Sequence, residues 1–131
     1  MFKSTPAFSS FSVDDLDKAQ KFYAETLGLD VEKTPEGLEL HIAGGGIPVF
    51  IYPSSGYHAP EHTVLNFLVD DIDVAVDGLH RRGVTMEQYN LPDMKTDARG
   101  VFRNEGGGMG PKAIAWFKDP AGHILSILQQ D

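Results

Sequence analysis

One stretch of this sequence occurs twice. The nine residues Phe11–Ala19 return as Phe67–Ala75, 56 residues further on, and six of the nine positions are identical. Internal repetition indicates one structural unit used twice, which constrains the architecture before any local pattern does. We therefore expect residues 1–131 to form a single domain made of two related modules, module one over 7–53 and module two over 63–130.

The first module has the pattern of a strand, a helix and three strands. Asp14 and Asp15 predict a helix N-cap, apolar residues follow at helical spacing, and Gly28 supplies the stop. Its strands are expected at 7–13, 29–33, 38–43 and 47–52, with the last two joined through Gly44, Gly45 and Gly46.

The second module repeats this order. Asp70 and Asp71 predict the helix start and Gly83 the helix end. Strands are expected at 63–69, 84–89, 113–117 and 124–128, with a turn over 119–122, where the sequence reads Asp-Pro-Ala-Gly.

The segment 90–112 breaks the symmetry between the modules because it is long and has no strand or helix pattern. It includes the glycine-rich run 105–110. Loops of this length are usually functional covers or disordered segments, and both readings stay open here. Lys95, Asp97 and Arg103 within it could hold a charged ligand or simply face solvent.

Charge and composition limit the partners of the chain. The net charge of −8 opposes binding to nucleic acid, because phosphate binding needs a basic face. No apolar run approaches the roughly 20 residues needed to span a membrane, and 1–6 lacks the apolar core of a secretory signal. We expect a cytoplasmic protein with a small-molecule partner and with neither a nucleic-acid nor a membrane partner.

Two motifs carry a resemblance to a known family. The helix start Val13-Asp-Asp-Leu-Asp-Lys-Ala19, followed by Phe22-Tyr23, and the terminal hairpin Asp119-Pro-Ala-Gly122 through Ser126 lie in two successive βαβββ units. This order resembles the vicinal oxygen chelate superfamily, which includes glyoxalases, bleomycin resistance proteins and extradiol dioxygenases. The resemblance implies an α+β fold in which two repeated βαβββ modules form a half-closed, mixed eight-stranded sheet. The ligand would lie on its concave face and the helices on its convex face, and a homodimer is expected.

The resemblance also implies where a metal ion would be bound. Metal-dependent members place four ligands on the first and last strands of each module, and these positions correspond to Phe8, Phe50 or Tyr52, Val64 and Ser126. None of these residues is His, Asp, Glu or Cys, whereas Zn²⁺, Mn²⁺ and Fe²⁺ need nitrogen, carboxylate or thiolate donors. We therefore expect no metal ion and no other cofactor.

Strand alternation places an apolar and aromatic set on the concave face in place of metal ligands. The expected ligand-binding residues are Phe8, Ser10, Phe50, Tyr52, Val64, Asn66, Trp116 and Ser126. Asn66 is the strongest polar candidate, although a structural hydrogen bond would equally explain an amide in a strand. Trp116 is the sole tryptophan, and whether it faces the core or the ligand is open.

The catalytic residues are unknown, with Glu39, His41 and Tyr52 as weak candidates. Glu39 and His41 share a strand face, which is the concave one only if the following hairpin loop has two residues rather than three. Of the other histidines, His58 and His62 are expected in an exposed linker and His123 in solvent.

Three functions remain, of which the third is a metal-dependent enzyme whose ligand positions differ from those given above. The favoured one is a metal-independent binding protein for a small aromatic or amphipathic molecule, as in bleomycin resistance proteins. The alternative is a glyoxalase-like lyase, isomerase or dioxygenase-type enzyme, with Glu39, His41 or Tyr52 as acid and base. No nucleophile with an adjacent base can be assembled from these strands.

Overall fold

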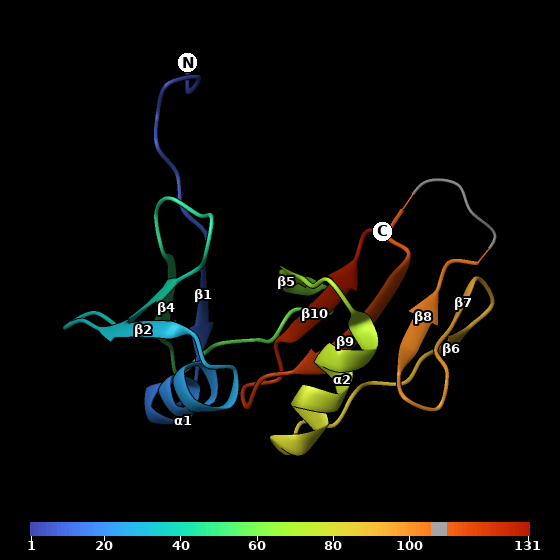
Figure 1. The fold of residues 1–131 in the computed structure, drawn as a ribbon. Coiled ribbons are helices and arrows are strands. Elements are labelled where there is room, and N and C mark those ends of the chain that lie inside the picture. The colour runs from blue at the N-terminus through green and yellow to red at the C-terminus, as the bar shows by residue number, and fades with distance from the viewer. Residues whose placement is uncertain (106–109) are drawn as a thin grey trace. The chain divides into compact units, whose positions relative to one another are not determined.

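The computed structural model describes residues 1–105 and 110–131, and the chain divides into two units, Met1–His58 and Ala59–Asp131. Each unit contains one copy of the repeated stretch and has its own four-stranded sheet (Figure 1). The boundary between the units falls inside the predicted linker. The module bounds of 7–53 and 63–130 stay a prediction.

The helix of the first unit begins where the aspartates predict. Asp15 is the N-cap: its backbone is extended and its side chain accepts a hydrogen bond from the Lys18 amide at 3.1 Å. The α-helix α1 (Leu16–Lys21) continues as the π-helical turn η1 (Phe22–Thr26). Gly28 follows with a φ of 72°, a left-handed value that glycine adopts without strain, and ends the helix as expected.

The sheet of the first unit has the strand order β1-β4-β3-β2. The strands are β1 (Ser10–Val13), β2 (Asp30–Lys33), β3 (Leu38–His41) and β4 (Val49–Pro53). β1 runs parallel to β4, and the other pairs are antiparallel. Val13, Leu38, Leu40 and Ile51 are fully buried on one face, and together with Ala19 and Tyr23 of the helix they form the core of the unit.

The second unit repeats this arrangement around α2 (Ile72–Arg81). Asp71 caps the helix by accepting hydrogen bonds from the amides of Asp73 and Val74, and Gly83 follows with a φ of 82°. The strand order is β5-β10-β9-β8, with β5 (Thr63–Leu68), β8 (Val101–Arg103), β9 (Ala113–Lys118) and β10 (Ile124–Gln129). α2 lies against β9 and β10, where its buried residues Ile72 and Val76 join the core (Figure 1).

The two sheets have the same topology, and this equivalence corrects one predicted strand. β5 pairs with β10 in parallel as β1 does with β4, so β8 occupies the place of β2. We predicted that 84–89 would take this place. That prediction is wrong: only Met86 in this segment forms a bridge, to Phe117 of β9. The edge of β9 is shared between Met86 and the short strand β8, which pairs with residues 113–115.

The segment 90–112 is also not the single long loop that was predicted. It contains a hairpin of two short strands, β6 (Asn90–Leu91) and β7 (Met94–Lys95), and then β8. The Thr96 hydroxyl accepts a hydrogen bond from the Tyr89 amide at 2.8 Å and closes the base of the hairpin. Residues 106–109 of the glycine-rich run lie outside the described residues, so the cover reading stays a prediction.

The fold is α+β, as predicted, with helices packed on one face of mixed sheets. Joining of the two four-stranded sheets into one half-closed eight-stranded sheet stays a prediction. None of the helices in 1–105 and 110–131 is both long and apolar enough to cross a membrane.

Candidate functional site

Three of the predicted ligand-binding residues meet on the open face of the sheet in the second unit. In the strand register Ser126 of β10 lies between Asn66 of β5 and Trp116 of β9. Their neighbours Leu125, Ile127, Ala115 and Phe117 point to the opposite face and are buried against α2. Alternation along the strands therefore places Trp116 on the open face, which the sequence left undecided.

A pocket of about 640 Å³ lies beside Trp116 within the second unit. Tyr89 packs edge-on against Trp116, with ring centroids 5.4 Å apart and ring planes at 84°. Ile124, Leu91 and Met94 add apolar walls, and Thr63 adds a hydroxyl. The volume falls in the range of small-molecule sites, which are mostly apolar with a few polar groups.

The position of Tyr89 depends on a segment that is not a regular strand. The Met86 bridge to Phe117 and a 2.8 Å hydrogen bond from the Glu87 amide to the Trp116 carbonyl hold residues 86–87 against β9. The β6-β7 hairpin then begins directly after Tyr89. The aromatic pair is thus built from β9 and from the segment beside it.

One ion pair lies at the pocket. Lys118 Nζ is 3.3 Å from Glu87 Oε1, and both residues line the pocket. Burial raises the pKa of the Tyr89 phenol above its ordinary value, the charge of Glu87 raises it further, and Lys118 opposes both. The pocket therefore keeps Tyr89 neutral, as a hydrogen-bonding hydroxyl, throughout the physiological range.

Asn66 makes a hydrogen bond inside its own sheet. Its Oδ1 accepts from the hydroxyl of Ser126, a residue that is fully buried. This hydrogen bond to the neighbouring strand supports the structural reading of Asn66. Val64 lies two residues earlier on β5 and is half-buried. Roles for Asn66, Ser126 and Val64 in ligand binding stay predictions.

The open face of the first unit carries the other predicted residues. Ser10 and Ser12 pair with Phe50 and Tyr52 across β1 and β4. Phe50 and Tyr52 stack with centroids 6.1 Å apart and an interplanar angle of 17°. Phe8 lies before the first residue of β1 and is 61% exposed. It is therefore not on the strand face, where we expected it.

Glu39 lies on this same face because it pairs with Phe50, and His41 follows two residues later on β3. The connection between β3 and β4 runs from 42 to 48, longer than either loop considered from the sequence. The strand register, not the loop length, decides the face.

The comparisons with known proteins agree with this architecture. The profile of the Glyoxalase family, described as the Glyoxalase/Bleomycin resistance protein/Dioxygenase superfamily, matches residues 8–127. This chain belongs to that superfamily. No curated protein sequence matches it.

Solved structures of the superfamily share its fold along nearly the whole chain. TnmS3, an antibiotic binding protein from Streptomyces sp. CB03234, has a TM-score of 0.62 at 23% identity over 98% of both chains. The fosfomycin resistance protein FosX from Listeria monocytogenes has a TM-score of 0.68 at 16% identity, over 98% of this chain and 94% of its own. A putative glyoxalase family protein from Bacillus anthracis has a TM-score of 0.65 at 16% identity over all of both chains.

Although the family's ligand positions lack metal donors, a different group of side chains within 1–105 and 110–131 could hold a metal ion. Ligand atoms of Glu32, Glu39 and His41 all lie within 4.8 Å of one another on the open face of the first unit. Sequence reasoning considered Glu39 and His41 only as an acid and base and missed Glu32, which lies on another strand. The alternating pattern of 30–33 could have indicated that Glu32 lies on one face of a strand. The sequence did not show that Glu32 lies opposite Glu39.

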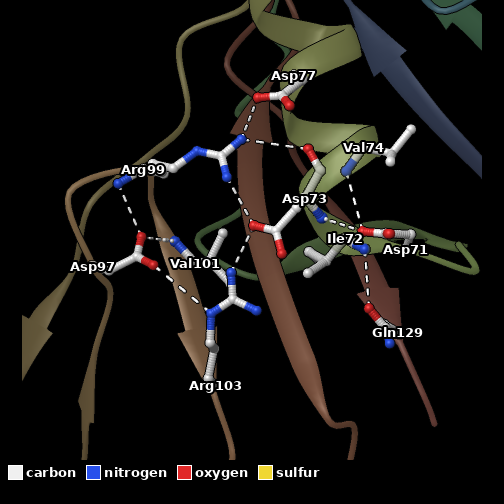
Figure 2. A network of polar contacts seen from close by, with 10 residues as sticks. All are labelled: Asp71, Ile72, Asp73, Val74, Asp77, Asp97, Arg99, Val101, Arg103 and Gln129. Atoms are coloured by element: carbon white, nitrogen blue, oxygen red, sulfur yellow. Dashed lines mark hydrogen bonds and ion pairs between the residues drawn. The ribbon is translucent and has the colours of Figure 1, made fainter.

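Asp97, Arg99 and Arg103 form a network of hydrogen bonds and ion pairs with α2 (Figure 2). Asp97 accepts hydrogen bonds from the amides of Arg99 and Val101, and so closes the turn before β8. Arg103 donates to Asp73 of α2 at 2.7 Å. That hydrogen bond raises the pKa of Arg103, burial opposes the rise, and nearby carboxylates, Asp73 first, add to it. Asp97 and Arg103 therefore both have partners within the second unit, and a role in holding a charged ligand stays a prediction.

His123 is buried, contrary to expectation, with 2% of its surface exposed. Its amide and that of Ala121 donate to Asp119 Oδ1, and these hydrogen bonds close the predicted turn between β9 and β10. The sequence places His123 correctly after a turn, but only the packing of that turn decides that the side chain points inward. His58 and His62 are exposed, as expected.

Proposed function

We propose that this superfamily member is a binding protein for a small aromatic or amphipathic molecule, and that this binding uses no metal ion or other cofactor. The observation that carries the proposal is the pocket of about 640 Å³ beside the Tyr89–Trp116 pair. Aromatic rings meeting edge to face offer a flat apolar surface on which another ring can stack.

The polar groups of the pocket support the same class of ligand. Thr63 and the neutral Tyr89 hydroxyl offer uncharged hydrogen bonds, and Glu87 and Lys118 are already paired with each other. Glu61 and His62 also line the pocket, and the carboxylate of Glu61 disfavours an anion further. A small polyanion would lack counter-charges there, and an unpaired buried charge is strongly penalised. The shared fold with an antibiotic binding protein is consistent with this reading, but at 23% identity the ligand class rests on the side chains.

Tryptophan fluorescence offers a direct test because the single tryptophan of the chain lines the pocket. Neutral and cationic aromatic compounds should quench or shift the emission of Trp116 saturably, in protein treated with a chelator. Sugar phosphates and dicarboxylates should not. We expect Tyr89→Ala to weaken a confirmed ligand by about 1–2 kcal/mol, roughly 5- to 30-fold, because it removes one wall of the stack.

Leu68→Ala is the matched control for this substitution. Leu68 is exposed on the same sheet but does not line the pocket, so its removal should leave the affinity unchanged. Ligand affinity that is equal in the wild type and in Tyr89→Ala would contradict the proposal, as would a panel in which small polyanions bind best.

An enzyme remains the alternative, favoured by one observation. His41 and Glu39 lie side by side on the open face of the first unit, with His41 Nε2 3.7 Å from Glu39 Oε1, so a potential base and a potential acid are available together. A glyoxalase-like lyase or isomerase using this pair would lose turnover in His41→Asn. The binding function would keep full affinity in the same variant, because all residues of its pocket lie in the second unit.

The remaining expectations concern assembly and location. The superfamily resemblance leads us to infer a homodimer, and the net charge of −8 supports a protein that does not bind nucleic acid. Cytoplasmic location stays a prediction. Light scattering of the purified chain and cell fractionation test these two points.

A further inference from the structure

Three metal-binding side chains converge on the open face of the first unit. His41 Nε2 is 3.4 Å from Glu32 Oε2 and 3.7 Å from Glu39 Oε1, and all three donor atoms lie within 4.8 Å of one another. The sheet itself produces this arrangement. Glu32 is the cross-strand partner of Glu39, and His41 follows Glu39 by two residues and so shares its face.

These separations are long for direct hydrogen bonds and short enough for a shared ion. Hydrogen bonds from nitrogen to oxygen are about 2.7–3.2 Å long. Donor atoms held by one metal ion at bonds of about 2.0–2.2 Å in a tetrahedral site lie roughly 3.3–3.6 Å from each other. The distances of 3.4 and 3.7 Å from the imidazole nitrogen to the two carboxylates are therefore close to those between ligands of a common centre.

The negative charges of Glu32 and Glu39 also favour the binding of a cation. Two glutamates directly opposite each other on paired strands repel, and such pairs are destabilising. A divalent ion between the carboxylates would offset that repulsion. The side chains of Glu39 and His41 are each more than half covered, at 37% and 38% exposure, and Glu32 reaches in from the edge strand at 64%.

We propose that Glu32, Glu39 and His41 bind one divalent transition-metal ion. One imidazole with two carboxylates suits Zn²⁺ and Co²⁺ better than Ca²⁺ or Mg²⁺, which prefer ligand sets made of oxygen alone. Three protein ligands leave a coordination position open to water or to a bound molecule. The site lies on β2 and β3, where Glu39 is the cross-strand neighbour of Phe50. It shares no residue with the Trp116 pocket, whose residues all belong to the other unit.

Equilibrium dialysis of tag-free protein against Zn²⁺, followed by elemental analysis, tests the proposal, and Co²⁺ adds a visible spectrum that reports its coordination. We expect saturable binding of about one ion per chain. His41→Ala and Glu39→Gln should each weaken binding by at least about tenfold, since even residues that merely support metal ligands contribute about 10- to 100-fold.

Two kinds of control separate this site from others. Glu25→Gln removes the same charge from an exposed position in the same unit, and His58→Ala and His62→Ala remove the linker histidines. All three variants should bind as the wild type does, and circular dichroism should show that every variant is folded. The proposal is overturned if the wild type binds no ion saturably, if His41→Ala retains full affinity, or if a linker variant abolishes binding.

Discussion

At the scale of single residues, Tyr89 forms one wall of the pocket in the second unit, and three interactions fix its position and its protonation state. Its ring lies against Trp116, its amide donates to Thr96, and its hydroxyl sits in the field of Glu87 and Lys118. The sequence suggested Trp116 as a candidate but gave no sign of Tyr89, because its strand prediction for 84–89 was wrong. The Tyr89–Trp116 contact forms because residues 86–87, which are distant in sequence, are hydrogen-bonded to β9.

Titration of Tyr89 offers a test of this environment. Burial and Glu87 raise the pKa of the phenol above about 10, so the folded state favours the neutral form. The stability from this preference is fully present below the unfolded pKa and is lost as the pH rises through the folded pKa. The ultraviolet difference between wild type and Tyr89→Phe, which isolates one of the four tyrosines, should therefore show phenolate formation above pH 10.

The neighbouring charges provide opposite controls. Glu87→Gln should lower the Tyr89 pKa and Lys118→Gln should raise it. A Tyr89 that titrates at or below its ordinary value in the folded protein would contradict the packing described for the pocket.

At the scale of elements, a network of charges joins α2 to the turn before β8. Asp73 Oδ1 accepts hydrogen bonds from Arg99 at 2.8 Å and from Arg103 at 2.7 Å, and Arg99 also pairs with Asp77 (Figure 2). β8 is a three-residue edge strand with few ladder bonds of its own. The network therefore supplies attachment that the short strand lacks.

Asp73→Asn should destabilise the protein modestly. Each pair is 39–59% exposed, so a single bridge would contribute little, but Asp73 serves two arginines at once. We expect a loss of about 0.5–1.5 kcal/mol in the free energy of unfolding, measured with denaturant. In about 1 M NaCl the loss should shrink, because screening is nearly complete at that salt concentration.

Asp70→Asn is the matched control for Asp73→Asn. It removes the same charge next to the same helix, from an exposed residue outside the network. Equal effects of the two substitutions would mean that overall charge, rather than the bonds to Arg99 and Arg103, accounts for the change.

At the scale of the whole molecule, the repeat has produced two units of the same topology with unequal packing. Both sheets pair their first and last strands in parallel, and both helices begin at an aspartate N-cap. Yet Ile72 is 1% exposed, whereas its counterpart Leu16 is only half-buried. Two positions that correspond in the repeat therefore differ in how deeply they are buried.

Substitutions at the two positions should differ in cost. We expect Ile72→Ala to lower the free energy of unfolding by about 3–4 kcal/mol and Leu16→Ala by about 1–2 kcal/mol, because the penalty follows the contacts and cavity left behind. Val74→Ala, at a position 64% exposed on α2, should cost less than about 0.5 kcal/mol. A greater loss at Leu16 than at Ile72 would contradict the packing of the two helices.

The sequence by itself determined the repeat, a helix start at each of the two aspartate pairs, both helix ends at Gly28 and Gly83, and the strand alternation that puts Phe50 and Tyr52 on one face. These features depend on neighbours within a few residues or on the two-residue period of a strand, so the residues themselves carry them.

The tertiary structure alone decided that Glu32 lies opposite Glu39, that Tyr89 meets Trp116, that β8 takes the edge of β9, and that His123 is buried. Each of these depends on register or packing between segments, which local pattern does not specify. A shift of one residue in register would send every side chain of a strand to its other face.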